Sequence, residues 1–161
     1  MAARDKQRQE LPSVLDRLID EDPDNTREKP RTLKELAVEL RNAVRRDVED
    51  LLNTRQRPLD PPEKLADLEE SSFEFGIPDF GAANMSSVER RRLYLKEIQK
   101  IIQLHEPRFQ SVRVLPVDER RTALRTLHFR IEAVLRTEPA PESVLYDSQV
   151  ELRTRAFRIQ L

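Results

Sequence analysis

A change of hydrophobic period at Pro107 constrains the fold more than any other feature of the sequence. In the segments before this proline, apolar residues recur every three or four positions, and after it they alternate with polar residues. The first spacing gives a helix one apolar side, and the second gives a strand one apolar face. This order predicts an α+β fold, in which N-terminal helices pack on one face of a small C-terminal antiparallel sheet.

Two helices are predicted from apolar stripes that follow capping signals. Thr32 and Glu35 form a capping box ahead of a stripe over residues 33–53. Ser86 and Glu89 form a second capping box, and the helix that they open ends before the proline of the period change, because its ring disfavours helical geometry. A shorter, earlier helix is predicted by four apolar residues on one side, which are Val14, Leu15, Leu18 and Ile19.

Four segments after the proline have the spacing of strands. They are "FQSVRVLPV", "ALRTLHFRIEAVL", "SVLYDSQV" and "RAFRI", and "DERR" predicts a hairpin turn between the first two. The second segment places six apolar residues on one face, which are Ala123, Leu127, Phe129, Ile131, Ala133 and Leu135.

Size and charge narrow the class of protein. The 161 residues fit a single domain over residues 11–161, after a charged tail, residues 1–10, that we expect to be mobile. The 29 basic residues nearly balance the 30 acidic ones, so we expect no general attraction to nucleic acid or anionic lipid. No apolar run approaches about 18 residues, which predicts no membrane insertion and a cytoplasmic location.

The sequence lacks the residues that most kinds of catalysis require. Cysteine is absent, and the two histidines, His105 and His128, fall on different predicted elements, so we expect no metal site and no cofactor. Glycoside hydrolysis is the alternative that stays open, with Glu106 as the acid and Asp79, Glu132 or Asp147 as its partner. Tryptophan is absent and tyrosine occurs twice, which is a poor set for holding a sugar.

Both glycines of the chain fall in "FEFGIPDFG", at Gly76 and Gly81. Their clustering predicts a backbone path with positive φ or a close approach of two segments. An ordinary tight connection and a binding loop both fit this pattern.

"HEPRF" places Glu106 and Arg108 on a stiff corner where the helix becomes a strand. An internal salt bridge and an exposed, interface-anchoring fork are both compatible with the sequence. We predict that Arg108 faces a partner and that Glu106 faces inward. A run of three arginines, residues 90–92, lies near the start of the same helix and is either a solvated face or a partner contact.

Several segments resemble one family in their order and spacing. "LRNAVRRDVEDLLNTR", "FGIPDF", "HEPRFQSVRV" and "LHFRIEAVLRTEPAPESVLYDS" resemble the TssE subunit family of the bacterial type VI secretion baseplate, which is similar to the wedge proteins of contractile-phage baseplates. The resemblance covers residues 11–159. It implies a structural protein without enzymatic activity, although the family carries a lysozyme-related label. It also implies a location in the cytoplasm, in a baseplate docked to the inner-membrane complex.

The resemblance also implies partners and site residues. The subunit would join TssF, TssG and TssK in a wedge close to the Hcp tube and the VgrG spike, and would nucleate the TssB and TssC sheath. Glu106, Pro107 and Arg108 would hold it in the wedge, and the strand that contains Val144 and Tyr146 would accept sheath arms. Many relatives have a glycine in the last hairpin, but "VELRTRAFRI" has none, so a tight hairpin and a single bent strand both remain open.

Overall fold

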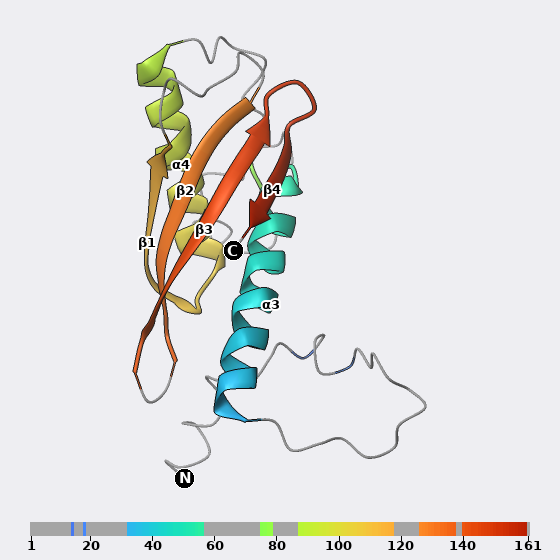
Figure 1. Ribbon diagram of the computed structural model, residues 1–161. Helices are drawn as coiled ribbons and strands as arrows, with labels where there is room; N and C mark the ends of the chain where they lie inside the picture. The colour runs from blue at the N-terminus through green and yellow to red at the C-terminus, as the bar shows by residue number, and fades with distance from the viewer. Residues whose placement is uncertain are drawn as a thin grey trace, which may run out of the picture.

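The computed structural model describes residues 32–56, 75–78, 87–117, 126–137 and 140–160, together with Val14 and Leu18. Its elements are the helices α3 (Leu33–Asn53) and α4 (Val88–His105) and the strands β1 (Phe109–Pro116), β2 (Thr126–Leu135), β3 (Glu142–Glu151) and β4 (Ala156–Gln160). The four strands form one antiparallel sheet in the order β1-β2-β3-β4 (Figure 1). The predicted α+β class, with helices before the sheet, is confirmed.

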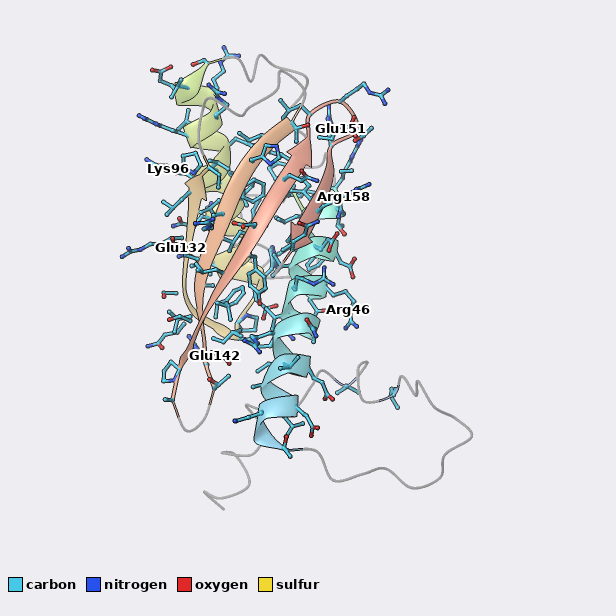
Figure 2. All side chains as sticks on the ribbon, in the orientation of Figure 1. Arg46, Lys96, Glu132, Glu142, Glu151 and Arg158 are labelled. Carbon is cyan, nitrogen blue, oxygen red and sulfur yellow. The ribbon has the colours of Figure 1, made fainter. Side chains whose placement is uncertain are left out.

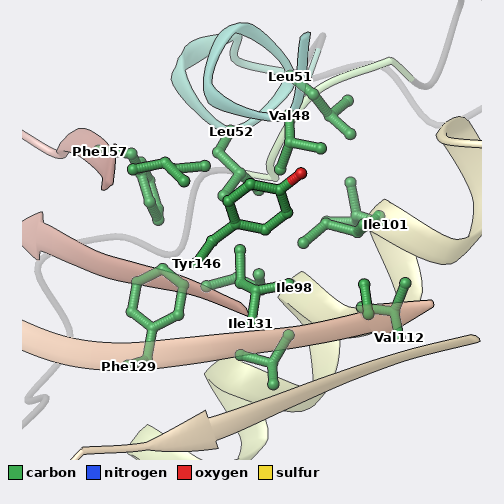
Figure 3. Packing of buried hydrophobic residues seen from close by; sticks show 14 of the residues in the cluster. Val48, Leu51, Leu52, Ile98, Ile101, Val112, Phe129, Ile131, Tyr146 and Phe157 are labelled. Atoms are coloured by element: carbon green, nitrogen blue, oxygen red, sulfur yellow. The ribbon is translucent and has the colours of Figure 1, made fainter. Parts of the chain in front are cut away.

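Alternation along the strands builds the core. Every second residue of β2 is buried, and β3 follows the same rule over most of its length. The buried side chains pack with those of both helices in one cluster, which has Tyr146 near its centre. Figure 3 shows its ring between Val48 and Leu52 of α3, Ile98 of α4 and Phe129 of β2. Burial of such a shared face is what holds two amphipathic helices on a sheet.

Helix caps differ in part from the predicted pattern. The capping box of Thr32 and Glu35 is present, with the Thr32 backbone N–H donating to Glu35 Oε2 over 2.7 Å. The N-cap of α4 is Ser87 and not Ser86, which lies outside the described residues. Ser87 Oγ donates to Glu89 Oε2 over 2.6 Å and makes no hydrogen bond to the helix backbone, so the second predicted capping box is wrong.

The Gly76 backbone makes the close approach that the sequence predicted. Its φ is +112°, and a Cβ at this position would lie 2.7 Å from the Thr54 carbonyl oxygen. The neighbouring Ile77 donates its N–H to that oxygen over 2.8 Å and forms a parallel bridge with Arg55. The glycine is therefore needed so that this segment can pair with the end of α3.

The last hairpin is tight although it has no glycine. Residues 152–155 form the turn between β3 and β4, and Arg155 takes the positive φ of 59° that a glycine would adopt most easily. Its N–H donates to the Glu151 carbonyl over 2.6 Å. This geometry decides between the two alternatives in favour of the hairpin.

Several predictions fall outside the described residues. These are the tail of residues 1–10, the "DERR" turn, Gly81, Ala123, and Leu15 and Ile19 of the first predicted helix. Val14 and Leu18 are helical, and their side chains are exposed. None of the described helices has the length and apolar character needed to cross a membrane.

Candidate functional site

The "HEPRF" corner joins α4 to β1 through one tight turn. Glu106 is the C-cap of α4, with φ −118° and ψ 84°, a non-helical geometry, and the residue before a proline disfavours the helical one. Its N–H donates to the Ile102 carbonyl over 2.9 Å, and its carbonyl accepts from the Phe109 N–H over 3.2 Å. The backbone therefore closes the helix and opens the strand within three residues.

The Glu106 carboxylate faces inward and binds Arg108. Arg108 Nε donates to Oε1 over 2.6 Å, Nη2 donates to Oε2, and the Arg108 backbone N–H donates to Oε1 over 3.2 Å. Such a paired, two-point contact is the strongest way for an arginine to hold a carboxylate. Glu106 is only 5% exposed, so almost all of its hydrogen bonding is internal.

A third residue, Asp47 of α3, completes the cluster. Arg108 Nη2 donates to Asp47 Oδ2 over 2.6 Å, although the two residues are 61 positions apart. Asp47 also lies 3.5 Å from Arg46 Nη2. The Glu106–Arg108–Asp47 cluster therefore ties the corner after α4 to the middle of α3, and the Arg108 carbonyl extends the tie by accepting from the Arg136 N–H at the end of β2.

The surroundings of Arg108 favour its charged form. Burial opposes the charge of the Arg108 guanidinium, but the hydrogen bonds and charge of Glu106, followed by those of Asp47, outweigh it and raise the pKa of Arg108. Burial also raises the pKa of Tyr146 to about 12, and the negative charge of Glu106 adds to this shift. The Glu106 charge therefore lies close to Tyr146, on the face of the sheet that the helices cover.

The surface of the triplet is small. Pro107 is exposed, and the Arg108 side chain is 25% exposed. Both Nε and Nη2 of Arg108 are engaged inside the protein. The internal salt bridge that the sequence left open is therefore present, and whether the triplet also contacts a partner stays a prediction.

Val144 and Tyr146 are core residues. They are 4% and 0% exposed, and Tyr146 Oη donates to the Arg41 carbonyl of α3 over 3.2 Å. Their side chains point away from any surface, because residues of this parity on β3 face the helices. The expectation that this strand accepts sheath arms concerns its backbone edge and stays a prediction. The exposed side chains of this segment are Ser143 and Leu145.

Helix side chains cover the outer edges of the sheet. On β1, Gln103 Nε2 donates to the Val112 carbonyl over 3.3 Å, and Gln99 Oε1 accepts from the Val114 N–H over 3.1 Å. On β4, the Asn53 side chain bonds both the N–H and the carbonyl of Phe157, over 2.9 and 3.2 Å.

Arg45 Nη1 adds a bond of 3.0 Å to the Ile159 carbonyl, so α3 covers β4 over most of its length. An unpaired strand edge is a template for a further strand. The helix side chains bond to backbone groups on the outer edges of β1 and β4 and so occupy these two edges.

The first half of β3 has an edge that β4 does not cover. The β3–β4 register ends at Asp147 and Gln160, so β3 continues past its neighbour (Figure 1). The Phe157 N–H donates to Asn53 of α3 and therefore faces away from β3. Backbone groups alternate in direction along a strand, so residues 156, 158 and 160 of β4 bond to residues 151, 149 and 147 of β3. By the same alternation, the backbone groups of Ser143 and Leu145 face the uncovered edge, and no hydrogen bond to them is found among the described residues.

Of the carboxylates proposed for glycoside hydrolysis, Glu132 and Asp147 lie on the opposite face of the sheet from Glu106. Glu132 and Asp147 lie on the open face of the sheet, which charged and polar side chains cover (Figure 2). Asp147 accepts from Arg130 Nε there over 2.8 Å. Glu106 lies on the covered side, and Asp79 is outside the described residues.

The described residues contain no cluster of three metal-ligating side chains. Of the two histidines, His105 packs edge-to-face against Phe75, with ring centroids 5.4 Å apart.

Sequence reasoning missed the residues that complete these structures. Four polar helix residues bond to another element: Asp47 and Asn53 across 61 and 104 positions, and Gln99 and Gln103 to the neighbouring strand β1. The only signal is that Gln99 and Gln103 are spaced i, i+4, which places them on one side of a helix.

Comparisons with known proteins give one match. The model of the family described as baseplate wedge protein gp25 (GPW_gp25) matches residues 38–140, which is more than half of the chain. This range begins in α3 and includes the whole Glu106–Arg108–Asp47 cluster. Neither the curated proteins nor the solved structures contain a significant match.

Proposed function

Because this chain belongs to the baseplate wedge protein gp25 family, we propose that it is the TssE-like wedge subunit of a type VI secretion baseplate. The family supports a structural role among other baseplate components of a contractile, phage-like machine. The segments "FGIPDF" and "HEPRFQSVRV" support the narrower assignment, through their resemblance to TssE. TssF, TssG and TssK are then its wedge partners, and its place is in the cytoplasm, in a baseplate docked to the inner-membrane complex.

The Glu106–Arg108–Asp47 cluster carries the proposal. Its three charged groups join α3, α4 and β1, and the hydrogen-bonding capacity of Glu106 is used inside the protein. A charge cluster of this kind fixes the relative position of the elements that it joins, which suits a structural role. Its rim, formed by Pro107 and the exposed quarter of Arg108, is a small, rigid surface suited to a fixed partner.

The uncovered edge of β3 supports a second part of the same role. The backbone groups of Ser143 and Leu145 are placed to accept an incoming strand, and an extended segment binds such an edge through main-chain hydrogen bonds. We assign this edge to the first layer of the TssB and TssC sheath. The baseplate, with the Hcp tube and VgrG spike at its centre, then presents a ring of such edges.

Peptidoglycan hydrolysis is the alternative from another class of protein. A general acid must reach the oxygen that it protonates, but the Glu106 carboxylate is 5% exposed and is bound at both oxygens by Arg108. These features support the structural role.

The proposed function is tested in cells that lack the gene. Deletion should abolish sheath assembly, seen as fluorescent sheath fibres, and re-expression of the chain should restore it. Purified protein should release no soluble fragments from peptidoglycan. Turnover that disappears in Glu106→Gln, or fibres that form normally in the deletion strain, would contradict the proposal.

A further inference from the structure

The uncovered edge of β3 lies beside the N-terminal half of α3. Arg41 of α3 pairs with Glu142 at the start of β3 over 3.0 Å, and the Arg41 carbonyl accepts from Tyr146 Oη over 3.2 Å. β4 ends at Gln160, whereas α3 extends past this end of β4 (Figure 1). Over residues 142–146, β3 therefore has α3 nearby, but none of the described strands pairs with its outer edge.

The side of α3 that faces this edge changes character along the helix. Val38, Arg41 and Arg45 are spaced three and four positions apart, so they lie on one side of α3. Arg45 bonds to the Ile159 carbonyl of β4 over 3.0 Å, and Arg41 reaches β3. Val38 has no polar group with which to occupy a strand edge, and it is 44% exposed. α3 therefore closes the sheet edge at β4 and leaves it open beside Val38.

A second exposed apolar side chain borders the edge on the other face of the sheet. Leu145 is 56% exposed and points to the open face, because its neighbours Val144 and Tyr146 point to the helices. The backbone groups of Leu145 and Ser143 face the uncovered edge. These unpaired groups therefore have an exposed apolar residue on each side, Val38 towards the helices and Leu145 on the open face.

One added strand would cover both apolar side chains. The side chains of a strand point alternately to the two faces of a sheet, so one residue of an added strand lies next to Leu145 and the following residue lies on the Val38 side. Each contact removes apolar surface from water, which favours an apolar residue at both positions. Exposed apolar residues that occur singly are common on protein surfaces, but these two flank backbone groups that also lack partners.

We propose that this edge binds an extended segment of about five residues, the length of the uncovered part of β3, in which two consecutive central residues are apolar. A strand with one solvated face alternates apolar and polar residues, so this pattern is distinctive. The inference rests on the proposed function, because the segment then belongs to the sheath component assigned to this edge. It deepens that function by specifying which side chains the segment carries.

The first test completes the edge within the chain itself. The β3–β4 register, continued past Gln160 and Leu161, places a first added residue opposite Leu145 and a second one on the Val38 side. A C-terminal extension of Val-Val-Thr-Thr should slow hydrogen exchange at the Leu145 N–H at least about tenfold. Asp-Asp-Thr-Thr should change it by less than about twofold, and Val-Asp-Thr-Thr and Asp-Val-Thr-Thr should each protect it less than Val-Val-Thr-Thr.

The second test uses cells in which deletion of the gene abolishes sheath assembly. Val38→Asp and Leu145→Asp should each reduce the number of fluorescent sheath fibres at least about tenfold, because the incoming strand would bury an unpaired carboxylate. Leu93→Asp on α4 and Leu115→Asp on β1 make the same change at exposed leucines away from this edge, and they should alter the number by less than about twofold. All four variants should keep the melting temperature of the wild type and co-purify with TssF and TssG.

Three results would overturn the proposal. They are normal fibres with folded Val38→Asp and Leu145→Asp variants, loss of wedge entry in these two variants alone, and equal exchange at Leu145 with the Val-Val and Asp-Asp extensions. In each case, a wild-type chain that enters the wedge leaves the proposed function in place. A wild-type chain that enters no wedge, although the Val-Val extension protects Leu145, contradicts the proposed function and not the preference of the edge.

Discussion

At the residue scale, the central question is what Arg108 does. The sequence alone predicts that it faces a partner, so that its removal would affect binding more than folding. The structure shows it between Glu106 and Asp47, with two of its nitrogens bound internally. A carboxylate that is 5% exposed depends on such a partner, because an unpaired buried charge is strongly unfavourable.

We therefore predict that Arg108→Ala lowers the free energy of unfolding by about 3 kcal/mol, the low end for a broken buried pair because Arg108 is partly exposed. Glu106→Ala should be milder, since Arg108 keeps Asp47 and can reach water. The Glu106→Ala/Arg108→Ala variant should be more stable than Arg108→Ala alone, because it leaves no buried carboxylate without its partner, and Asp47 is partly exposed to water. Urea unfolding of the three variants measures this, and a wild-type midpoint for Arg108→Ala would show that the pair is not structural.

At the element scale, helix side chains protect the sheet edges. Gln99→Leu leaves the buried Val114 N–H without its acceptor, and Gln103→Leu leaves the Val112 carbonyl without its donor. Each change should destabilise the protein by about 1 kcal/mol. Gln99→Leu should also speed hydrogen exchange at Val114, whereas Gln110→Leu, at an exposed position of β1, should change neither quantity.

The uncovered edge of β3 gives a second prediction at this scale. Leu145→Pro removes an N–H that faces the open edge, so it should block sheath assembly while leaving the wedge intact. Tyr146→Pro removes an N–H that faces β2 and should unfold the protein, because it breaks the β2–β3 ladder. Normal sheath fibres with a folded Leu145→Pro variant would show that this edge does not seed the sheath.

Most helices and strands could be predicted from the sequence. The side-chain bonds that hold them to one another could not. Alternation in "LHFRIEAVL" gave β2 its buried face, and the capping box at Thr32 gave α3 its start, because both signals are local. Asp47 and Asn53 act across 61 and 104 positions, a range that no spacing rule reaches. The open edge of β3 was predicted as a strand edge, but the residues that face it depend on where β4 ends.

At the scale of the whole molecule, two buried tyrosines predict how stability depends on pH. Burial raises the pKa of Tyr94 and of Tyr146 to about 12, from an ordinary value of 10.0. The unfolded chain loses these protons at lower pH than the folded protein does. The stabilisation is therefore fully present below pH 10 and is lost as the pH rises to about 12.

By pH 12, this effect should lower the free energy of unfolding by about 2 kcal/mol for each tyrosine. Urea unfolding measured from pH 10 to about pH 12 should show that the free energy of unfolding falls less steeply with pH for the Tyr94→Phe/Tyr146→Phe variant than for the wild type. Identical slopes for the two proteins would mean that the tyrosines do not control alkaline stability.

The most direct test of a wedge subunit is whether it enters a wedge. The chain, carrying an affinity tag, should be co-expressed with TssF and TssG, the wedge partners proposed for it, and the purified material should be analysed by size-exclusion chromatography. We predict that all three proteins elute together as one complex of fixed composition. Elution of the chain alone, with TssF and TssG assembling without it, would contradict a role in the baseplate wedge.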